Sequence, residues 1–151
     1  MCFIMRILSK TEVKKVLRQL NKQFEIKDLK LDYIFLKSEK DRIFIVNKDF
    51  GEVDVENINT VGLYIAKVEK DGIRLSIEGS QIFGAKASKN VLVLDKPDEW
   101  LLGNNIGVKV GLKGYVIVKC GEDFLGCGKI VKGKLHNFVP KSRRISEVAP
   151  S

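Results

Sequence analysis

Glycine and lysine alternate in one segment of the C-terminal third, in a pattern suited to binding phosphate. Gly107, Gly111 and Gly114 permit close backbone approach and leave amides free, and Lys109 and Lys113 stand among them. Such a segment could hold a phosphate group or a splayed nucleotide. It matches neither the phosphate-binding loop of nucleoside triphosphatases nor a dinucleotide-binding G-x-G-x-x-G, so we expect no nucleoside-triphosphate site. The alternative is that these glycines only form the turns of a barrel.

A second basic cluster follows, in which five cations occupy thirteen residues without an acidic residue among them: Lys132, Lys134, Lys141, Arg143 and Arg144. Runs of this kind often form disordered tails. Here apolar residues are interleaved with the charges, and their burial would fix the charges on a surface. A guanidinium group matches phosphate through two parallel hydrogen bonds, so the two arginines are the strongest candidates for contacts with a phosphate backbone.

The net charge of +8 is concentrated in the same region. Residues 1–102 hold 18 Lys and Arg against 16 Asp and Glu, whereas residues 103–145 hold 9 against 2. A field of one sign attracts polyanions, of which phosphate backbones are the commonest. The predicted RNA-binding residues are therefore Gly107, Lys109, Lys113, Lys132, Lys134, Lys141, Arg143 and Arg144.

Residues able to perform catalysis are scarce. The only histidine, His136, falls on a predicted strand, and Cys120 and Cys127 lack a further Cys/His pair to complete a zinc site. The alternating acids between residues 52 and 56 lack the glycine turn and terminal glutamate of a calcium loop, which favours a solvated strand edge. We expect a protein that is not an enzyme, with no catalytic residues, no cofactor and no metal.

Regular elements must position the basic residues. Ser9 and Glu12 form the capping-box pattern before an amphipathic helix over residues 10–24. Period-two alternation then predicts two β-hairpins, the second turning at Asp71-Gly72, where positive φ is tolerated. Their strands are expected at residues 33–36, 42–46, 61–68 and 73–77.

The small and polar residues 79–89 indicate a domain boundary, which divides the chain into an N-terminal domain of residues 1–83 and a second domain of residues 84–151. In the second domain Asp95 is the expected N-cap of a short helix with Pro97 in its first turn. Short strands separated by glycine turns argue for a small barrel, with strands expected at residues 91–94, 115–120, 124–131 and 135–139.

The C-terminal portion, with its Leu125-Gly-Cys-Gly128 element, resembles the PUA domain, a pseudobarrel found in RNA-modifying and ribosome-assembly proteins. Gly126 and Gly128 are expected to be structural, permitting a bulge in a curved strand. The chain as a whole resembles the nuclear-import-protein-seven family of ribosome-biogenesis factors in three features: the early Arg6-Ile-Leu-Ser9 with its helix, the hairpin ending Arg42-Ile-Phe-Ile-Val46, and Trp100-Leu-Leu-Gly103-Asn104 leading into the domain. Residues 135–145 are similar to the tail of PUA-like modules of RNA cytosine methyltransferases. The expected fold class is α+β: an N-terminal mixed α/β (pre-PUA) domain with antiparallel hairpins, followed by a PUA-like β-pseudobarrel.

The function expected from charge and resemblance is a non-catalytic, RNA-binding role in ribosome biogenesis, with the basic domain binding structured rRNA or tRNA. An alternative is an accessory RNA-targeting subunit for an RNA-modifying enzyme of the cytosine methyltransferase or pseudouridine synthase type. A third is an adaptor that binds acidic protein surfaces. We expect a protein partner at the N-terminal domain, no membrane partner, and a cytoplasmic location, since no apolar run reaches about 18 residues and the three cysteines fit a reducing compartment. Translation could start at Met1 or Met5.

Overall fold

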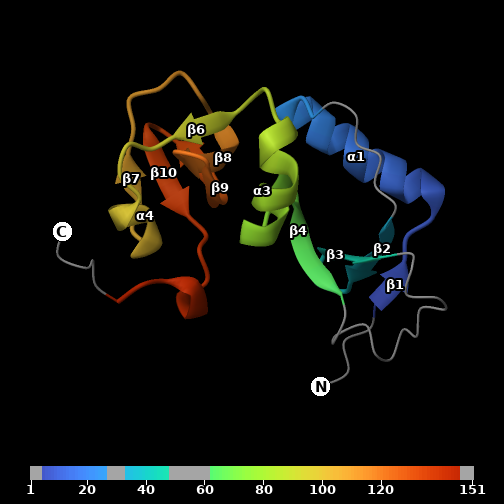
Figure 1. Cartoon of the computed structure of the whole chain (residues 1–151). Coiled ribbons are helices and arrows are strands. Elements are labelled where there is room, and N and C mark those ends of the chain that lie inside the picture. Colours follow the sequence, from blue (N-terminus) through green and yellow to red (C-terminus); the bar gives the residue numbers. More distant parts are fainter. Residues whose placement is uncertain (1–4, 27–32, 48–61, 147–151) are drawn as a thin grey trace.

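The computed structural model describes residues 5–26, 33–47 and 62–146. They form two five-stranded β-sheets with few helices, and helix α3 (Ile77–Phe83) lies between the sheets (Figure 1). The predicted strand edge at residues 52–56 and the start at Met1 lie outside the described residues. No helix in the described ranges is long and apolar enough to cross a membrane.

Helix α1 (Lys10–Phe24) begins at the predicted residue and is capped as predicted. The Ser9 side chain accepts a hydrogen bond from the Glu12 amide, and the Glu12 side chain accepts one from the Ser9 amide, both at 3.2 Å. These reciprocal bonds satisfy amides that the first turn leaves unpaired. The apolar side of the helix buries Leu20 and Phe24 completely.

The first sheet is an antiparallel meander in which strands follow one another in sequence order. Both predicted hairpins are confirmed, and Gly72, with a φ of 152°, follows Asp71 at the second turn. The prediction for the last strand was wrong at its end, because the strand stops at Leu75 and Ser76 caps helix α3 instead. The strands are β1 (Met5–Ile7), β2 (Tyr33–Ser38), β3 (Arg42–Asn47), β4 (Leu63–Glu69) and β5 (Gly72–Leu75).

Helix α3 and the 3-10 turn η3 (Gly84–Lys86) occupy much of the segment, residues 79–89, that the sequence indicated as a domain boundary. Glycine and serine have low helix propensity, but each has a local role here. A Cβ atom at Gly79 would lie 2.0 Å from the carbonyl oxygen of Ile65, so only glycine lets the helix pack this closely on β4. The Ser76 hydroxyl accepts from the Gly79 amide and donates to the Tyr64 carbonyl.

The second sheet has the order β6-β8-β9-β10-β7, with β6 parallel to β8 and the other pairs antiparallel. Two sequence predictions need correction here. Helix α4 (Asp98–Leu101) has Pro97 rather than Asp95 at its N-cap, and the last strand ends before Phe138. The strands are β6 (Val91–Val93), β7 (Ile106–Gly107), β8 (Gly114–Cys120), β9 (Asp123–Val131) and β10 (Lys134–Asn137).

The predicted bulge in β9 is confirmed and anchors helix α4. The register of the β8–β9 pairing shifts beside Gly126, whose φ is 128°. The adjacent Leu125 carbonyl accepts a 3.1 Å hydrogen bond from the indole N–H of the fully buried Trp100. A Cβ atom at Gly128 would lie 2.5 Å from the Leu135 side chain, so this glycine is also structural.

One hydrophobic core joins the two sheets. It includes Phe24 of α1, Ile65 of β4 and Phe83 of α3 together with Ile117 of β8 and Cys127 of β9. Polar contacts reinforce this junction, because the last carbonyl groups of α1 accept hydrogen bonds from residues 88–90 at the entry to the second sheet.

A second polar junction connects the β4–β5 turn to the second sheet. Tyr115 of β8 and Lys129 of β9 both donate hydrogen bonds to the Asp71 carboxylate, and the ammonium also lies 5.4 Å from the centre of the tyrosine ring. The bond from Lys129, followed by that from Tyr115, lowers the pKa of Asp71. Burial, helped by the negative charge of the carboxylate, raises the pKa of Tyr115.

Candidate nucleic-acid interface

Four of the predicted lysines gather at one edge of the second sheet, which we call the lysine rim: Lys109, Lys113, Lys132 and Lys134. Strand β7 pairs with β10 through Gly107 opposite Lys134, and the Val108 amide donates to the Gly133 carbonyl at 2.8 Å. Gly114 pairs with Ile130, which brings the start of β8 beside the end of β9. The two basic segments found in the sequence therefore meet at this edge.

The turn between β9 and β10 presents one of these lysines through an unusual backbone conformation. Lys132 and Gly133 are its two central residues, with φ values of 50° and 75°. Two consecutive positive φ angles define a type I′ turn, whose twist matches that of the flanking strands. This conformation turns the chain tightly and leaves Lys132 exposed at the tip.

The glycines of the rim differ in what the fold requires of them. Gly114 has a φ of 76°, which side chains disfavour. A Cβ atom at Gly107 or Gly111 would meet nothing within 4 Å, and neither of these two residues has positive φ. Packing within the described residues therefore does not explain them, while their lack of a side chain leaves the backbone open to an approaching ligand.

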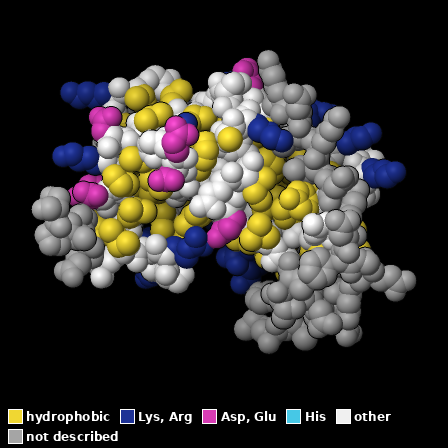
Figure 2. Space-filling view, viewed as in Figure 1, with side chains coloured by type: hydrophobic (Ala, Val, Ile, Leu, Met, Phe, Trp, Pro, Cys, Tyr) yellow, Lys and Arg dark blue, Asp and Glu magenta, His cyan; other side chains and the backbone are white. Residues whose placement is uncertain are grey.

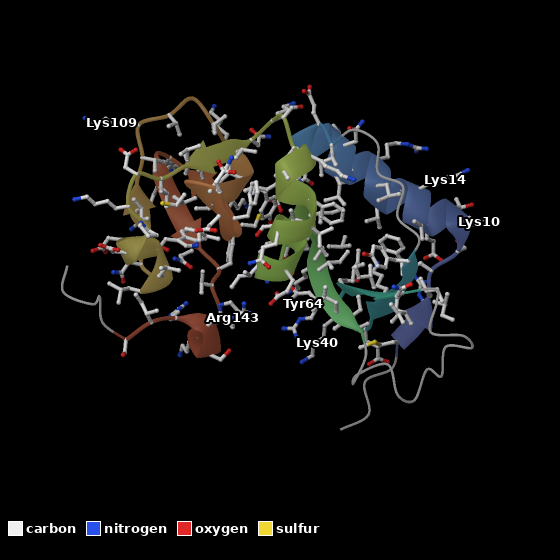
Figure 3. The ribbon with its side chains drawn as sticks, viewed as in Figure 1. Lys10, Lys14, Lys40, Tyr64, Lys109 and Arg143 are labelled. Carbon is white, nitrogen blue, oxygen red and sulfur yellow. The ribbon has the colours of Figure 1, made fainter. Side chains whose placement is uncertain are left out.

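The lysine rim carries unbalanced positive charge. All four lysines are exposed, and none takes part in an ion pair among the described residues. Residues 103–145 contain two acidic residues, Glu122 and Asp123, and these lie at the opposite end of the long β8–β9 hairpin. Lys109 projects outward from the loop that follows β7 (Figure 3). Such a surface is free to pair with an external anion.

The remaining predicted residues are not part of the rim. Lys141 and Arg143 belong to the 3-10 turn η4 (Lys141–Arg143), beyond the far end of β10. Figure 3 shows Arg143 well separated from Lys109. The positive charge that the sequence concentrates in residues 103–145 is therefore divided in the structure between the lysine rim and a separate group in the tail.

Both arginines of the tail already have intramolecular partners. Arg143 forms a 2.5 Å ion pair with Glu78 of α3. The Arg144 Nε donates to the Val139 carbonyl at 2.9 Å, and its side chain packs on Gly103. The Ile145 amide also donates to the Leu101 carbonyl. These contacts hold the tail against the domain, as its interleaved apolar residues suggested.

A pocket of about 270 Å³ lies between the two sheets, and we call it the arginine pocket. Guanidinium groups approach it from β3, β5 and η4, and two aromatic rings line it. In Figure 2, Lys and Arg side chains lie beside an acidic side chain at the lower middle of the molecule. The polar and aromatic lining of the pocket includes Arg42, Tyr64, Arg74, Glu78, Phe138 and Arg143.

Sequence reasoning missed Arg42, Arg74 and Tyr64 as a group. They lie on three strands within residues 1–102, where the net charge is close to balanced, so charge counting gave no indication. Only the pairing of β3 with β4 and of β4 with β5 brings them to one face. The sequence contained one indication of this group: Arg42, Tyr64 and Arg74 each lie in a predicted strand, where a side chain can face the sheet surface.

Residues considered for other chemistry have ordinary environments. His136 lies on strand β10, as expected, opposite Lys129. Cys120 and Cys127 are free thiols, and burial raises the pKa of Cys127 to about 12. No group of three or more His, Cys, Asp or Glu side chains in the described ranges could hold a metal ion.

Residues 87–145 match a protein family described as the methyltransferase RsmF PUA domain. The matched region runs from the entry to β6 through η4, so it includes the lysine rim but neither Arg42 nor Arg74. The second sheet, with helix α4 and the turn η4, is therefore similar to a PUA domain of this type. The comparison supports the similarity of the tail to methyltransferase modules, and it does not support the narrower nuclear-import-protein-seven family.

Two curated relatives are similar over a larger part of the chain. Ribosomal RNA small subunit methyltransferase F of Aeromonas salmonicida is 28% identical over 110 residues, which cover 70% of this chain and 23% of the relative. The protein of the same name from Vibrio parahaemolyticus is 25% identical over 144 residues, which cover 88% of this chain and 29% of the relative. The chain thus spans about a quarter of the length of these relatives.

Proposed function

We propose that this chain is a non-catalytic RNA-binding module that uses the lysine rim to contact the phosphate backbone of structured RNA. The observation that carries the proposal is the meeting of four exposed, unpaired lysines at one edge of a PUA domain. Lysine side chains at such an edge position an RNA without reading its sequence, because phosphates are the same at every nucleotide.

Small-subunit ribosomal RNA is the ligand class we propose first. Both relatives are named as methyltransferases of that RNA, and their similarity to this chain extends beyond the PUA domain. The chain would then deliver RNA to a modifying enzyme, or to a catalytic segment acting with it, rather than perform the chemistry itself. A role in ribosome biogenesis through binding alone is the second candidate, favoured by the same surface.

Binding measurements with a quadruple Lys→Gln variant test the proposal. Lys109, Lys113, Lys132 and Lys134 are replaced together, and affinities for small-subunit rRNA fragments and for tRNA are measured between about 50 and 200 mM salt. Each phosphate contact contributes about 0.7 to 0.9 to the slope of log K against log salt, so we expect the slope to fall by about 3.

A variant with four exposed helical cations replaced, Lys10, Lys14, Lys15 and Arg18, is the matched control because it loses the same charge. Equal loss of binding in the two variants would show that only net charge matters. An unchanged slope in the lysine-rim variant would refute the proposed site. Recovery of a modifying enzyme with the chain favours RNA targeting, whereas recovery of a preribosomal particle alone favours ribosome biogenesis.

A further inference from the structure

We propose that the arginine pocket is a second RNA site, which binds one phosphate group of an RNA strand and stacks the attached base. The inference rests on the proposed function and deepens it, because it assigns a nucleotide-sized subsite outside the matched PUA region. The sequence of the second domain alone does not predict this site, because two of the three arginines that line the pocket, Arg42 and Arg74, belong to the first sheet.

Aromatic rings hold two of the guanidinium groups in place. The Arg74 guanidinium lies 4.5 Å from the centre of the Phe138 ring, and that of Arg42 lies 5.6 Å from the centre of the Tyr64 ring. Figure 3 shows Tyr64 and Arg143 approaching each other below α3. Such packing restricts the guanidinium planes while leaving N–H groups at their edges free to donate.

The protein itself provides few acceptors for these donors. Arg143 pairs with Glu78, and Arg74 is 3.9 Å from Glu69. The side chain of Arg42 takes part in no ion pair or hydrogen bond among the described residues. Within the lining, three arginines face one carboxylate, so the pocket has an excess of positive charge. An external anion would balance this charge and use the free donors.

The pocket size limits that anion to a small group. Its volume of about 270 Å³ is below the range of about 300–1,000 Å³ typical of sites for cofactors and drug-sized ligands. One phosphate and part of its nucleoside fit such a volume. The remainder of a polymer would extend into solvent from the open side of the pocket.

Stacking distinguishes RNA from an acidic peptide as the occupant. A carboxylate could also pair with arginine, but a peptide side chain would gain little from the flat surface that Arg74 and Phe138 present. Unpaired RNA bases stack on guanidinium planes as well as on aromatic rings. A base stacked on the Arg74 guanidinium would continue the existing stack while its phosphate bonds to Arg42.

The lysine rim and the arginine pocket are close enough for one RNA. Strand β10 connects Lys134 at the rim to the residue before Phe138 in the pocket. With a rise of about 3.3 Å per residue, the three steps from Lys134 to Asn137 span about 10 Å. Phosphates two nucleotides apart on one strand, or phosphates of opposite strands of a stem, can occupy both sites at this separation.

Photocrosslinking of the unaltered protein is the first test. A small-subunit rRNA fragment carrying 4-thiouridine in its loops is irradiated with the full chain, and crosslinked peptides are identified by mass spectrometry. The expected products contain Tyr64 or Phe138. Crosslinks confined to the segments around residues 109–113 and 132–134 would overturn the pocket and leave the lysine rim supported.

A charge-matched pair of variants provides the second test. In Arg42→Gln/Arg74→Gln the affinity for the same RNA is expected to fall about 10- to 100-fold, because Arg42 offers charged hydrogen bonds to the phosphate and Arg74 a stacking surface for the base. The slope against log salt is expected to fall by about 1, the contribution of one phosphate. The control Lys10→Gln/Lys14→Gln, which removes two exposed cations of α1, is expected to bind like the unaltered chain.

Thermal unfolding of both variants establishes that they fold. Equal affinity in the arginine variant and the unaltered chain would overturn the inference, as would an equal loss in the lysine control. A variant that binds RNA normally but no longer binds a polyglutamate peptide would also overturn it, in favour of an acidic protein partner. Absence of RNA binding by the unaltered chain would instead refute the proposed function itself.

Discussion

The side chain of Gln23 closes the free edge of the first sheet, and its removal is expected to destabilise the protein. Within the described ranges, strand β5 is an edge strand, whose backbone groups on one side have no neighbouring strand. The Gln23 carboxamide reaches from α1 and bonds to both polar groups of Ile73, donating to the carbonyl at 2.9 Å and accepting from the amide at 2.7 Å. It therefore acts as one residue of an additional strand.

The structure sets the size of the effect of Gln23→Ala. Two neutral hydrogen bonds to the Ile73 backbone are lost, each contributing about 0.5–1.5 kcal/mol, together with the bond from Gln19 that the control below also removes. Ile73 is only 2% exposed, so water replaces these bonds incompletely. We expect the free energy of unfolding to fall by about 1–3 kcal/mol. Gln19→Ala is the control, because it removes only the 2.8 Å bond that Gln19 donates to Gln23, and we expect less than about 1 kcal/mol.

The pH dependence of the variant Gln23→Glu distinguishes the bond to the Ile73 carbonyl from the bond to the Ile73 amide. A carboxylate keeps the bond from the Ile73 amide but faces the Ile73 carbonyl with a negative oxygen, which disfavours the charged form in the folded state. The pKa of the introduced carboxyl group is therefore raised above its unfolded value of about 4.3. The penalty is complete above the folded pKa and disappears as pH falls below the unfolded value, when the protonated acid donates as the amide did.

Urea unfolding followed by circular dichroism measures these differences. Gln23→Ala should lower the midpoint without changing the slope with denaturant. For Gln23→Glu the deficit relative to the unaltered chain should shrink between about pH 7 and pH 4. A deficit below about 0.5 kcal/mol in Gln23→Ala, or one in Gln23→Glu that grows on acidification, would refute the edge-pairing role.

Two further substitutions or modifications test the packing of the second sheet. Gly128→Ala should lower the free energy of unfolding by about 1–3 kcal/mol, because the new Cβ would lie 2.5 Å from the Leu135 side chain and 2.9 Å from the His136 carbonyl oxygen. Gly111→Ala, at a position with open space, should change the free energy of unfolding by less than about 0.5 kcal/mol. Equal effects of the two substitutions in urea unfolding would contradict the packing argument. Because burial raises the pKa of Cys127 to about 12, iodoacetamide at pH 8 should modify the partly exposed Cys120 much faster, and equal rates by peptide mass spectrometry would count against burial of Cys127.

Elements that are determined by interactions between residues close in sequence could be predicted from the sequence. The capping box of α1 and the Asp71-Gly72 turn depend on residues within one or two turns of chain, so the pattern sufficed. Helix α3 was missed because its stability comes from contact with β4 and β9 rather than from helix propensity. Asp95 was misjudged as a cap because a suitable residue type before a proline does not determine where the helix starts.

Prediction of the candidate site succeeded only where charge was local in sequence. The lysines of the rim come from two short segments with almost no acids, and the structure places them at one edge. Arg143 and Arg144 were in the same basic count, yet they turn toward Glu78 and the Val139 carbonyl. The direction of each side chain and its tertiary partners decide which cations remain free. A count of charges along the chain gives no information on side-chain direction or on tertiary partners.

The core shared by the two sheets has a consequence for affinity. Because Phe24, Ile65, Ile117 and Cys127 pack in one cluster, the lysine rim and the arginine pocket sit on a single rigid frame. On the proposed function, an RNA held at one site would meet the other as an intramolecular partner, at an effective concentration of order millimolar or higher. Two individually weak contacts would then act as one bivalent binding surface. Such a surface would select RNAs whose phosphates match its fixed spacing, so shape would decide the preferred ligand even though neither site reads a base sequence.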